Sequence, residues 1–480
     1  RWGPRRDMTR YGREIEVVVD RPAACFGAWY EMFPRSQGME SGKSASFKDC
    51  IARLPDIKRM GFDVVYLVPI HPIGGKNRKG KNNAVVAEAG DPGSPYAIGA
   101  AAGGHTAIHP DLGTLEDFRA FVAACTALGM EVALDFAVQC SLDHPWVREH
   151  PEWFAFQPDG SIKYAENPPK KYQDIVNLNF HTVDQAGLWQ ALRDVVLFWI
   201  RQDVRIFRVD NPHTKPYPFW EWLIGSVQGE HPDVIFLAEA FTRPKPLRYL
   251  AKLGFTQSYT YFTWRNRKQE IIDYFIELTQ SETKEYLRPN LFTNTPDILP
   301  DFLQHGGPGA FRIRLVLAAT LAGVYGIYNG FELCEAQALP NSEEYLDSEK
   351  YQFKVWDWDR PGNIKSYIAE VNRIRRENAS FGDWLNLEFL PCDNDQVLFF
   401  GRFGAHSLDH ALVAVSLDPH APQAARLELP LARLGFSDGD RVVLEDLWTR
   451  QRSEQLGRHQ QVSLNPSQPA LIQRLQSMAA

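Results

Sequence analysis

The chain has 480 residues, of which 44% are hydrophobic and 23% charged, and its formal net charge at pH 7 is −7. These proportions exclude a disordered, collagen-like or coiled-coil protein and leave a globular chain with room for one large core and an accessory domain. The acidic balance argues against a general binder of nucleic acid.

After a lead-in of residues 1–25, short apolar runs alternate with amphipathic stretches from residue 26 to 380. This is the order of a parallel sheet with crossover helices. Eight runs predict strands, at residues 26–30, 64–69, 131–136, 205–210, 234–239, 259–263, 291–293 and 324–328. Eight strand–helix units predict an α/β fold, a (β/α)₈ TIM barrel.

Two helices of this barrel are predicted by apolar stripes. Residues 115, 118, 122 and 125 lie at helical spacing after Thr114, which fits an N-cap. A second stripe, at residues 188, 192, 195, 196 and 200, precedes the fourth strand. Each stripe predicts a helix that packs against the sheet.

Two stretches with little periodicity lie on the strand-to-helix side, where barrel enzymes build their sites. The first, residues 73–112, is rich in Gly, Asn and Ala; the second, residues 140–182, follows the third strand and is rich in aromatic residues. Long loops there are more often functional than decorative. We expect the 140–182 stretch to form a loop subdomain.

The character of the chain changes after residue 378. Short apolar runs at 385–390, 396–403, 411–417, 425–429 and 441–447 are separated by turn residues. They predict a C-terminal antiparallel β-sandwich domain over residues 381–480.

The cysteine spacing and the length of the apolar runs indicate in which compartment the protein works and whether it spans a membrane. Six cysteines show no CxxC pair, which favours reduced thiols. The longest apolar run, residues 315–328, falls short of the ~20 residues of a membrane span and predicts a buried helix followed by a buried strand. No basic segment followed by an apolar signal core opens the given sequence, which begins at Arg1 rather than Met and leaves open what precedes it, so export is disfavoured but not excluded. We expect a cytoplasmic protein with no membrane partner.

Acidic side chains end several predicted strands. Asp135, Asp210, Glu239 and Asp297 lie at or just beyond the ends of four of them. An acid at the end of an otherwise apolar barrel strand lies at the barrel mouth, where it is costly unless paired or used. Any one of them fits a structural ion pair, but their convergence predicts a catalytic site.

Paired carboxylates suit glycosidic chemistry, because one can attack the anomeric carbon while the other protonates the departing oxygen. Asp210 is the better nucleophile, since Arg208 lies two residues earlier on the same strand face and favours the ionised form. Glu239, in the apolar run FLAEAF, is the better acid/base, because desolvation raises its pKa toward neutrality.

These segments resemble the four signature segments of the α-amylase clan, glycoside hydrolase family 13. The sequence is more similar still to the α-1,4-glucan:maltose-1-phosphate maltosyltransferases, through AWYEMFPRS, GKNRKGKNN, KKYQDIVNLNF, FRVDNPHTKP, FLAEAFTRP, GFTQSYTYFTWRN, NTPDILP and YGIYNGFELCE. The resemblance implies a retaining enzyme with Asp210 as nucleophile, Glu239 as acid/base and Asp297 as the carboxylate that steadies the transition state. Arg208 and Asp135 would support them.

Two departures from the general amylase pattern bear on metal and substrate. Gln139-Cys140 replaces the usual Asn-His, whose Asn is a calcium ligand in many amylases, and Pro296 replaces the His before the third carboxylate. The histidines near these loops show no metal-ligand spacing. We expect no metal and no cofactor, and sugar contacts that differ from those of starch hydrolases.

The donor implied by the resemblance carries a phosphate. By similarity, Lys79, Asn167, Tyr172 and Asn211 are the expected phosphate contacts, and Gln139 and His213 are further expected substrate contacts. For Lys79, a solvated basic loop is the alternative. The run at residues 75–82 nearly spells a phosphate-binding P-loop, but it ends in Asn82 rather than Ser or Thr and no helical pattern follows.

The resulting hypothesis is transfer of maltosyl from α-maltose 1-phosphate to the non-reducing end of an α-1,4-glucan, with retention. The alternatives are a hydrolase or transglycosylase acting on non-phosphorylated α-glucan, and a glucan-binding protein without activity. The resemblance also implies a homodimer as a possible state. No nucleic-acid partner is expected.

Overall fold

The computed structural model describes residue 12 and residues 17–167, 170–404 and 409–477. Within them, eight parallel strands form one sheet in the order β10-β11-β1-β2-β3-β7-β8-β9. The strands are β1 (Gly27–Met32), β2 (Val64–Leu67), β3 (Glu131–Phe136), β7 (Ile206–Val209), β8 (Ile235–Ala238), β9 (Gln257–Ser258), β10 (Asn290–Phe292) and β11 (Val324–Tyr328). A parallel bridge from Ser258 to Pro289 joins the two ends of the sheet and closes the barrel.

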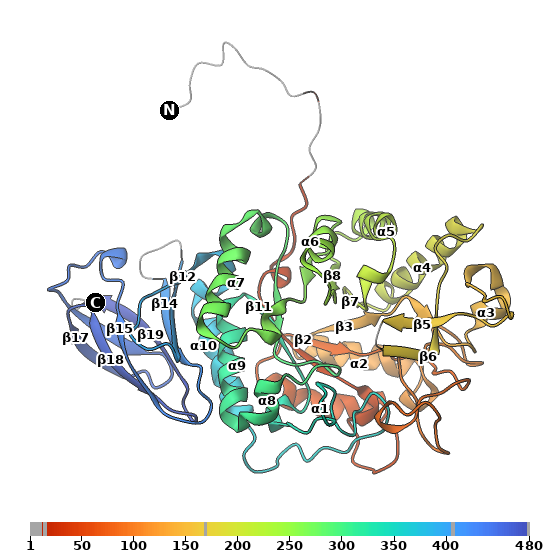
Figure 1. Cartoon of the computed structure of the whole chain (residues 1–480), viewed down its shortest axis with the longest axis horizontal. Helices are drawn as coiled ribbons and strands as arrows, with labels where there is room; N and C mark the ends of the chain where they lie inside the picture. Colours follow the sequence, from red (N-terminus) through yellow and green to blue (C-terminus); the bar gives the residue numbers. More distant parts are fainter. Residues whose placement is uncertain (1–11, 13–16, 168–169, 405–408, 478–480) are drawn as a thin grey trace.

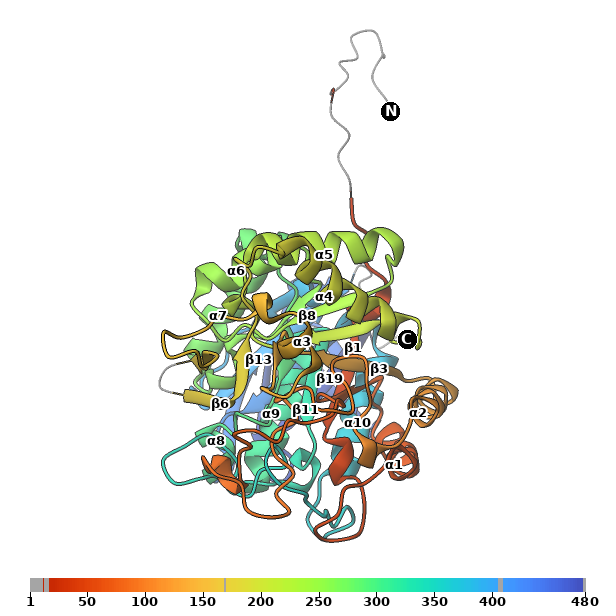
Figure 2. The ribbon, with the colours of Figure 1, turned by 90° about the vertical axis from the view of Figure 1, so that its right-hand side faces the viewer.

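Helices follow the strands and surround the barrel (Figure 2). They are α1 (Phe47–Arg59), α2 (Leu115–Ala127), α4 (Gln185–Ile200), α5 (Tyr217–Glu230), α6 (Pro244–Lys252), α7 (Lys268–Gln280), α8 (Asp301–His305), α9 (Gly307–Leu321) and α10 (Lys365–Glu377). The two predicted stripes are confirmed, and Thr114 caps α2 by accepting a hydrogen bond from the Asp117 N–H. Among the described residues, none of the helices combines the length and apolarity that a membrane span requires.

Side-chain alternation along the strands separates the barrel interior from the helix-facing side. One buried cluster fills the interior and includes Trp29, Tyr66, Ile206, Leu237 and Tyr259. Residues two positions further along the same strands face the same way. The alternation therefore directs Glu31, Arg208 and Glu239 into the barrel, nearer its carboxyl end.

The sixth strand was predicted at the wrong position. The prediction was residues 259–263, but the strand is Gln257–Ser258, and residues Tyr261–Trp264 form a short 3-10 helix. The Thr260 side chain accepts the Phe262 N–H and caps that helix. An aromatic run with good strand propensity was overridden by this local cap.

The two loops with little periodicity differ in content. Residues 140–182 contain α3 (Pro145–Glu149), β5 (Tyr164–Asn167) and β6 (Lys170–Asn177), and β6 pairs with both β5 and β4 (Gln139–Cys140) in an antiparallel sheet. Residues 73–112 hold only the short 3-10 turns Lys81–Asn83 and Pro110–Leu112. The run at 75–82 has no helix after it, so it lacks the structural context of a P-loop.

The C-terminal domain has two antiparallel sheets. One follows the order β12-β13-β14-β19-β16-β17 and the other pairs β15 with β18. The strands are β12 (Leu387–Phe389), β13 (Val397–Phe403), β14 (His410–Ser416), β15 (Gln423–Glu428), β16 (Arg441–Asp446), β17 (Arg452–Leu456), β18 (His459–Leu464) and β19 (Ala470–Ser477). Five of these strands were predicted, and β17, β18 and β19 were not.

The strands β13 and β14 of the larger C-terminal sheet are buried on both faces. Leu398 and Phe400 of β13 belong to the core shared with the barrel, whereas Val397 and Phe399 pack with the smaller sheet. Arg402, also on β13 and fully buried, donates to the carbonyls of Thr320 and Asp383. This domain lies at the opposite end of the molecule from β5 and β6 (Figure 1).

Candidate active site

The Arg208 guanidinium is the centre of the site. It lies on β7 with only 3% of its surface exposed. Its Nη1 donates to an oxygen of Asp135 at 2.9 Å and to one of Asp210 at 3.0 Å, and its Nη2 lies 2.6 Å from Glu239 Oε1. One cation therefore gathers carboxyls from three neighbouring strands, as the predicted convergence requires.

Asp135 is held from two further directions. Its Oδ2 accepts the hydroxyls of Tyr66 at 2.6 Å and Tyr96 at 2.9 Å. Burial, opposed by Arg208 and reinforced by Asp210, raises the pKa of Asp135 to about 6. The carboxyl is thus held in place by three donors, Tyr66, Tyr96 and Arg208.

Glu239 lies directly after β8, and its backbone N–H donates to Val209 O at 3.0 Å. Desolvation raises its pKa well above the usual value, Arg208 opposes this rise, and Asp210 and Asp297 reinforce it. A buried carboxyl with a raised pKa that lies close to a second carboxyl has the properties of a general acid.

Asn211 forms hydrogen bonds to both Asp210 and Glu239, and its backbone conformation makes this possible. It adopts a left-handed conformation with φ of 43°, which Asn tolerates better than most residues. Its backbone N–H donates to Glu239 at 3.4 Å and its side-chain amide to Asp210 at 3.4 Å. The sharp turn after the strand thus holds Asn211 against both carboxyls.

Asp297 comes from the loop after β10 and is paired with Lys350. The Lys350 ammonium lies 2.7 and 3.0 Å from its two oxygens and faces the ring of Tyr96 at 5.0 Å. Asp297 also acts electrostatically on Glu239. The structure therefore brings the third predicted carboxylate to the same site and adds a cation that the sequence did not predict.

The predicted phosphate and sugar contacts are placed as follows. The Lys79 side chain is buried, and desolvation, opposed by Asp174, lowers its pKa. Gln139 is buried and donates to Tyr96 O at 3.4 Å. Tyr172 lies on β6 and acts electrostatically on Lys350. Asn167 ends β5, but its side chain lies outside the described residues.

His213 and Lys215 flank the turn after Asp210. Burial lowers the pKa of His213, with Lys215 adding to the effect. Burial, opposed by Asp210, lowers the pKa of Lys215 to about 8. His213 Nδ1 is buried and has no hydrogen-bond partner among the described residues, so it is available to a ligand.

Three residues of the site escaped the sequence analysis. Tyr66 lies two residues after Val64 on β2 and faces the barrel interior with it, so its inward direction was readable from the strand pattern. Tyr96 and Lys350 lie in irregular loops, where no periodicity indicates direction. Only tertiary folding brings these two residues to Asp135 and Asp297.

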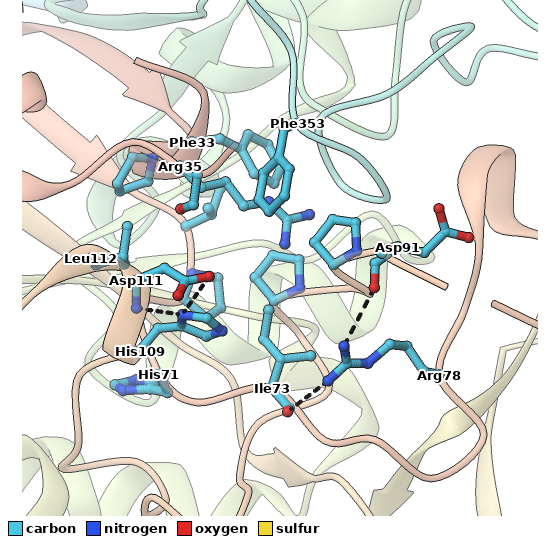
Figure 3. A pocket seen from close by; sticks show the side chains of 17 residues that line it. Phe33, Arg35, His71, Ile73, Arg78, Asp91, His109, Asp111, Leu112 and Phe353 are labelled. Carbon is cyan, nitrogen blue, oxygen red and sulfur yellow. Dashed lines mark hydrogen bonds and ion pairs between the residues drawn. The ribbon is translucent and has the colours of Figure 1, made fainter. Parts of the chain in front are cut away.

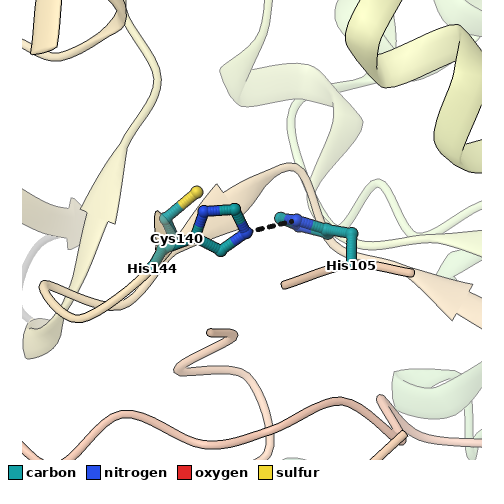
Figure 4. Close-up of side chains that lie close together, drawn as sticks. All are labelled: His105, Cys140 and His144. Carbon is teal, nitrogen blue, oxygen red and sulfur yellow. Dashed lines mark hydrogen bonds between the residues drawn. The ribbon is translucent and has the colours of Figure 1, made fainter. Parts of the chain in front are cut away.

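His105, Cys140 and His144 form a buried cluster whose possible ligand atoms lie within 4.8 Å of one another (Figure 4). His105 Nε2 donates to Ala137 O at 3.0 Å, and its Nδ1 accepts from His144 Nε2 at 3.1 Å. His144 Nδ1 accepts the Trp146 N–H at 3.1 Å. Since Nδ1 already accepts, His144 Nε2 must carry the proton of a neutral ring.

This bonding does not fit a metal site. A neutral histidine that ligates through Nε2 carries its proton on Nδ1, and that proton would face the Trp146 N–H. Burial lowers the pKa of His105 to about 4 and, with His105, that of His144 to about 2, so both rings are neutral. The cluster is a hydrogen-bonded relay that supports the start of α3.

A cavity of about 260 Å³ is lined by none of the site's carboxylates (Figure 3). Arg35 forms part of its wall and donates to the carbonyls of Gly93, Glu349 and Lys350. These bonds tie three loops together. Arg35 therefore fixes the loop from which Lys350 reaches Asp297.

The arrangement of barrel, loop subdomain and C-terminal β-domain is that of the α-amylases. A maltogenic α-amylase from Thermotoga neapolitana aligns with a TM-score of 0.71 at 20% identity, over 93% of this chain and 98% of that one. An α-amylase from Anoxybacillus aligns with a TM-score of 0.74 at 17% identity, over 96% and 100%. These identities establish the fold alone.

Sequence similarity identifies the family. The family described as "GLGE, C-terminal" matches residues 389–475. A protein of Rhodospirillum rubrum named α-1,4-glucan:maltose-1-phosphate maltosyltransferase is 59% identical over 472 residues, 98% of this chain and 69% of that protein. A protein of the same name from Pseudomonas aeruginosa is 56% identical over 466 residues, 97% and 70%. The chain belongs to the family of the α-1,4-glucan:maltose-1-phosphate maltosyltransferases.

Proposed function

We propose that the protein transfers maltosyl from α-maltose 1-phosphate to the non-reducing end of an α-1,4-glucan, with retention of the α configuration. Relatives that are 59% and 56% identical over nearly the whole chain carry the name of this activity. The observation in the site that supports it is the single guanidinium, Arg208, which gathers Asp135, Asp210 and Glu239.

In the first half of the reaction, Asp210 attacks the anomeric carbon while Glu239 gives its proton to the oxygen that leaves with the phosphate. The bond to phosphate breaks, and an ester forms between maltosyl and the Asp210 carboxylate. Arg208 Nη1 donates to Asp210 at 3.0 Å and orients the attacking oxygen, and burial raises the pKa of Glu239, which favours the protonated form that the first step needs. Asp297 stabilises the positive charge that develops on the sugar ring.

In the second half, Glu239 is ionised and accepts the proton of the acceptor 4-hydroxyl. The acceptor oxygen attacks the anomeric carbon from the face the phosphate left, and the ester to Asp210 breaks. Two inversions give net retention. Asn211, hydrogen-bonded to both carboxyls, keeps them in register through both steps.

For the donor phosphate we propose contacts from Lys79, Asn167, Tyr172 and Asn211, and for the sugar contacts from Gln139 and His213. Lys79 is a buried cation without an ion pair in the described part of the chain, so an anionic ligand would offset its desolvation. The unoccupied Nδ1 of His213 is suited to a sugar hydroxyl.

The test incubates the protein with α-maltose 1-phosphate and glycogen. We expect phosphate release matched by chain growth in steps of two glucose units, with new α linkages in the nuclear magnetic resonance spectrum. Reducing sugar from glycogen alone would point to a hydrolase, and binding without turnover to a glucan-binding protein. Asp210→Ala abolishes either enzymatic signal.

We further propose that the protein works in the cytoplasm. All six cysteines are free, as a reducing compartment requires. The homodimer implied by the family resemblance is a separate proposal, tested by light scattering of the purified protein.

A further inference from the structure

Glu31 is a buried acid that the reaction described above does not use. It lies on β1, two residues after Trp29, and so faces the barrel interior, and none of its surface is exposed. Its strand neighbours are Tyr66 on one side and Tyr328 on the other. Neither of its carboxyl oxygens has a hydrogen-bond partner among the described residues.

Three donors in the same interior lack a well-formed hydrogen bond among the described residues, namely Arg208 Nε, the Tyr259 hydroxyl and Trp29 Nε1, although Arg208 interacts with the Tyr259 hydroxyl. They are neighbours, since Arg208 lies 5.8 Å from the ring of Tyr259, and the rings of Tyr259 and Trp29 both contact Phe292. Buried polar groups are almost always satisfied, and an internal water with two to four polar partners is the usual reason when no side chain reaches. The acid and the three donors together supply those partners.

The charge balance shows in which form Glu31 exists. Arg208 already faces three carboxyls through its two terminal nitrogens, so it has little attraction left for a fourth. The charged and phenolic groups that act on Glu31 are Arg208, Asp135, Glu239 and Asp297, with Tyr66, Tyr96, Tyr259, Tyr328 and Tyr345 around them. An ionised Glu31 would be a buried charge without compensation, which proteins avoid by retaining the proton.

We propose that Glu31 is a positioning residue that remains protonated and, through an ordered internal water, holds Arg208 beneath the three carboxyls of the site. A protonated carboxyl both donates and accepts, so it can complete the bonding of a water that also meets Arg208 Nε and Tyr259. Burial raises the pKa of Glu31 well above its usual value, which agrees with this form.

The consequence for catalysis runs through Arg208. Its fixed position lowers the pKa of Glu239 and orients the Asp210 carboxyl group through a hydrogen bond of 3.0 Å. An Arg208 that is free to shift does both less well. Loss of Glu31 should therefore lower kcat more than it raises KM, and should move the alkaline limb of the pH profile upward, because Glu239 then holds its proton to higher pH.

Two variants separate hydrogen bonding from packing. Glu31→Gln keeps the shape and both a donor and an acceptor, and we expect its kcat to remain within about threefold of wild type. Glu31→Met keeps the volume but loses the polar group, and we expect kcat to fall about tenfold, with a smaller change in KM and an alkaline limb shifted upward. A merely structural defect would reduce the active fraction without moving that limb.

Infrared spectroscopy tests the protonation state without substrate. We expect a carboxylic-acid C=O band at pH 7.5 that is lost in Glu31→Gln and retained in Glu332→Gln. Glu332 is the matched control, because it is equally buried but bonded to Tyr30 and Arg53. The kinetic experiments depend on the proposed function, whereas the infrared experiment does not. A failure of the proposed function can therefore be distinguished from a failure of this inference. A wild-type pH profile in Glu31→Met, or a band unchanged in Glu31→Gln, overturns the inference.

Discussion

Lys350→Met removes the cation that pairs with Asp297 and leaves the stem of the side chain in place. The ammonium lies 2.7 and 3.0 Å from the two carboxylate oxygens, and 10% of the lysine side chain is exposed against 36% of the aspartate. Water can therefore replace part of the interaction on the aspartate side. The loss lies below the range for breaking a fully buried pair.

A hydrogen bond to a charged group contributes about 1.5–3 kcal/mol, which corresponds to a loss of about 10- to 150-fold in kcat/KM if the pair places Asp297 in the transition state. The assay is the initial rate of phosphate release from α-maltose 1-phosphate with glycogen as acceptor. We expect the double variant Lys350→Met/Asp297→Asn to lose little more than the more impaired of the two single variants, because each change disables the same pair.

Lys354→Met is the matched control. Lys354 lies four residues further along the same loop, with its Nζ 4.0 Å from Glu335 and over the ring of Trp356. It contacts none of the carboxylates at the barrel mouth in the described structure, so its rate should stay near wild type. Equal losses in the two variants, or a wild-type rate in Lys350→Met, would refute the reasoning.

Three further predictions concern acid/base chemistry, pH and the domain contact. Glu239→Gln should lower kcat for phosphate release by about 10²–10⁴-fold, the usual share of general acid–base catalysis. Because the folded pKa of Asp135 is raised to about 6 from 3.8, the folded state binds its proton more tightly, and stability falls as pH rises from 4 to 6. The free energy of unfolding of Asp135→Asn should therefore rise relative to that of wild type as the pH increases from 4 to 6, by roughly 3 kcal/mol at most, which thermal unfolding at several pH values measures. Arg402→Met should lower the unfolding temperature through a loss of about 3 kcal/mol while KM is unchanged, because it leaves the Thr320 and Asp383 carbonyls without their donor.

The barrel could be predicted because its parallel strands are buried on both faces. Strands such as β11 (Val324–Tyr328) are therefore continuous apolar runs that stand out from the helices between them. The acids that follow such runs could be placed at one end of the barrel for the same reason. The geometry of parallel strands was thus sufficient to predict that Asp135, Asp210 and Glu239 lie close together.

Two kinds of feature could not be predicted: strands whose residues are mostly exposed, and contacts made by residues in irregular loops. The strands β17 and β18 have mostly exposed or half-exposed residues, among them Glu454 and Gln461, so they show no apolar run. Lys350 reaches Asp297 from a loop that Arg35 ties down through backbone carbonyls. Such bonds are independent of the identity of the residues that supply the carbonyls, so the sequence carries no trace of them.

The charges of the site fall into two groups with different tasks. Arg208 is shared among Asp135, Asp210 and Glu239, whereas Lys350 is directed at Asp297. A cation shared by three acids cannot keep them all ionised in a buried place, so one acid retains its proton, as a general acid must. Asp297 is partly exposed and has a cation of its own in Lys350. The division of the two cations thus supports the different roles proposed for acids of the same kind.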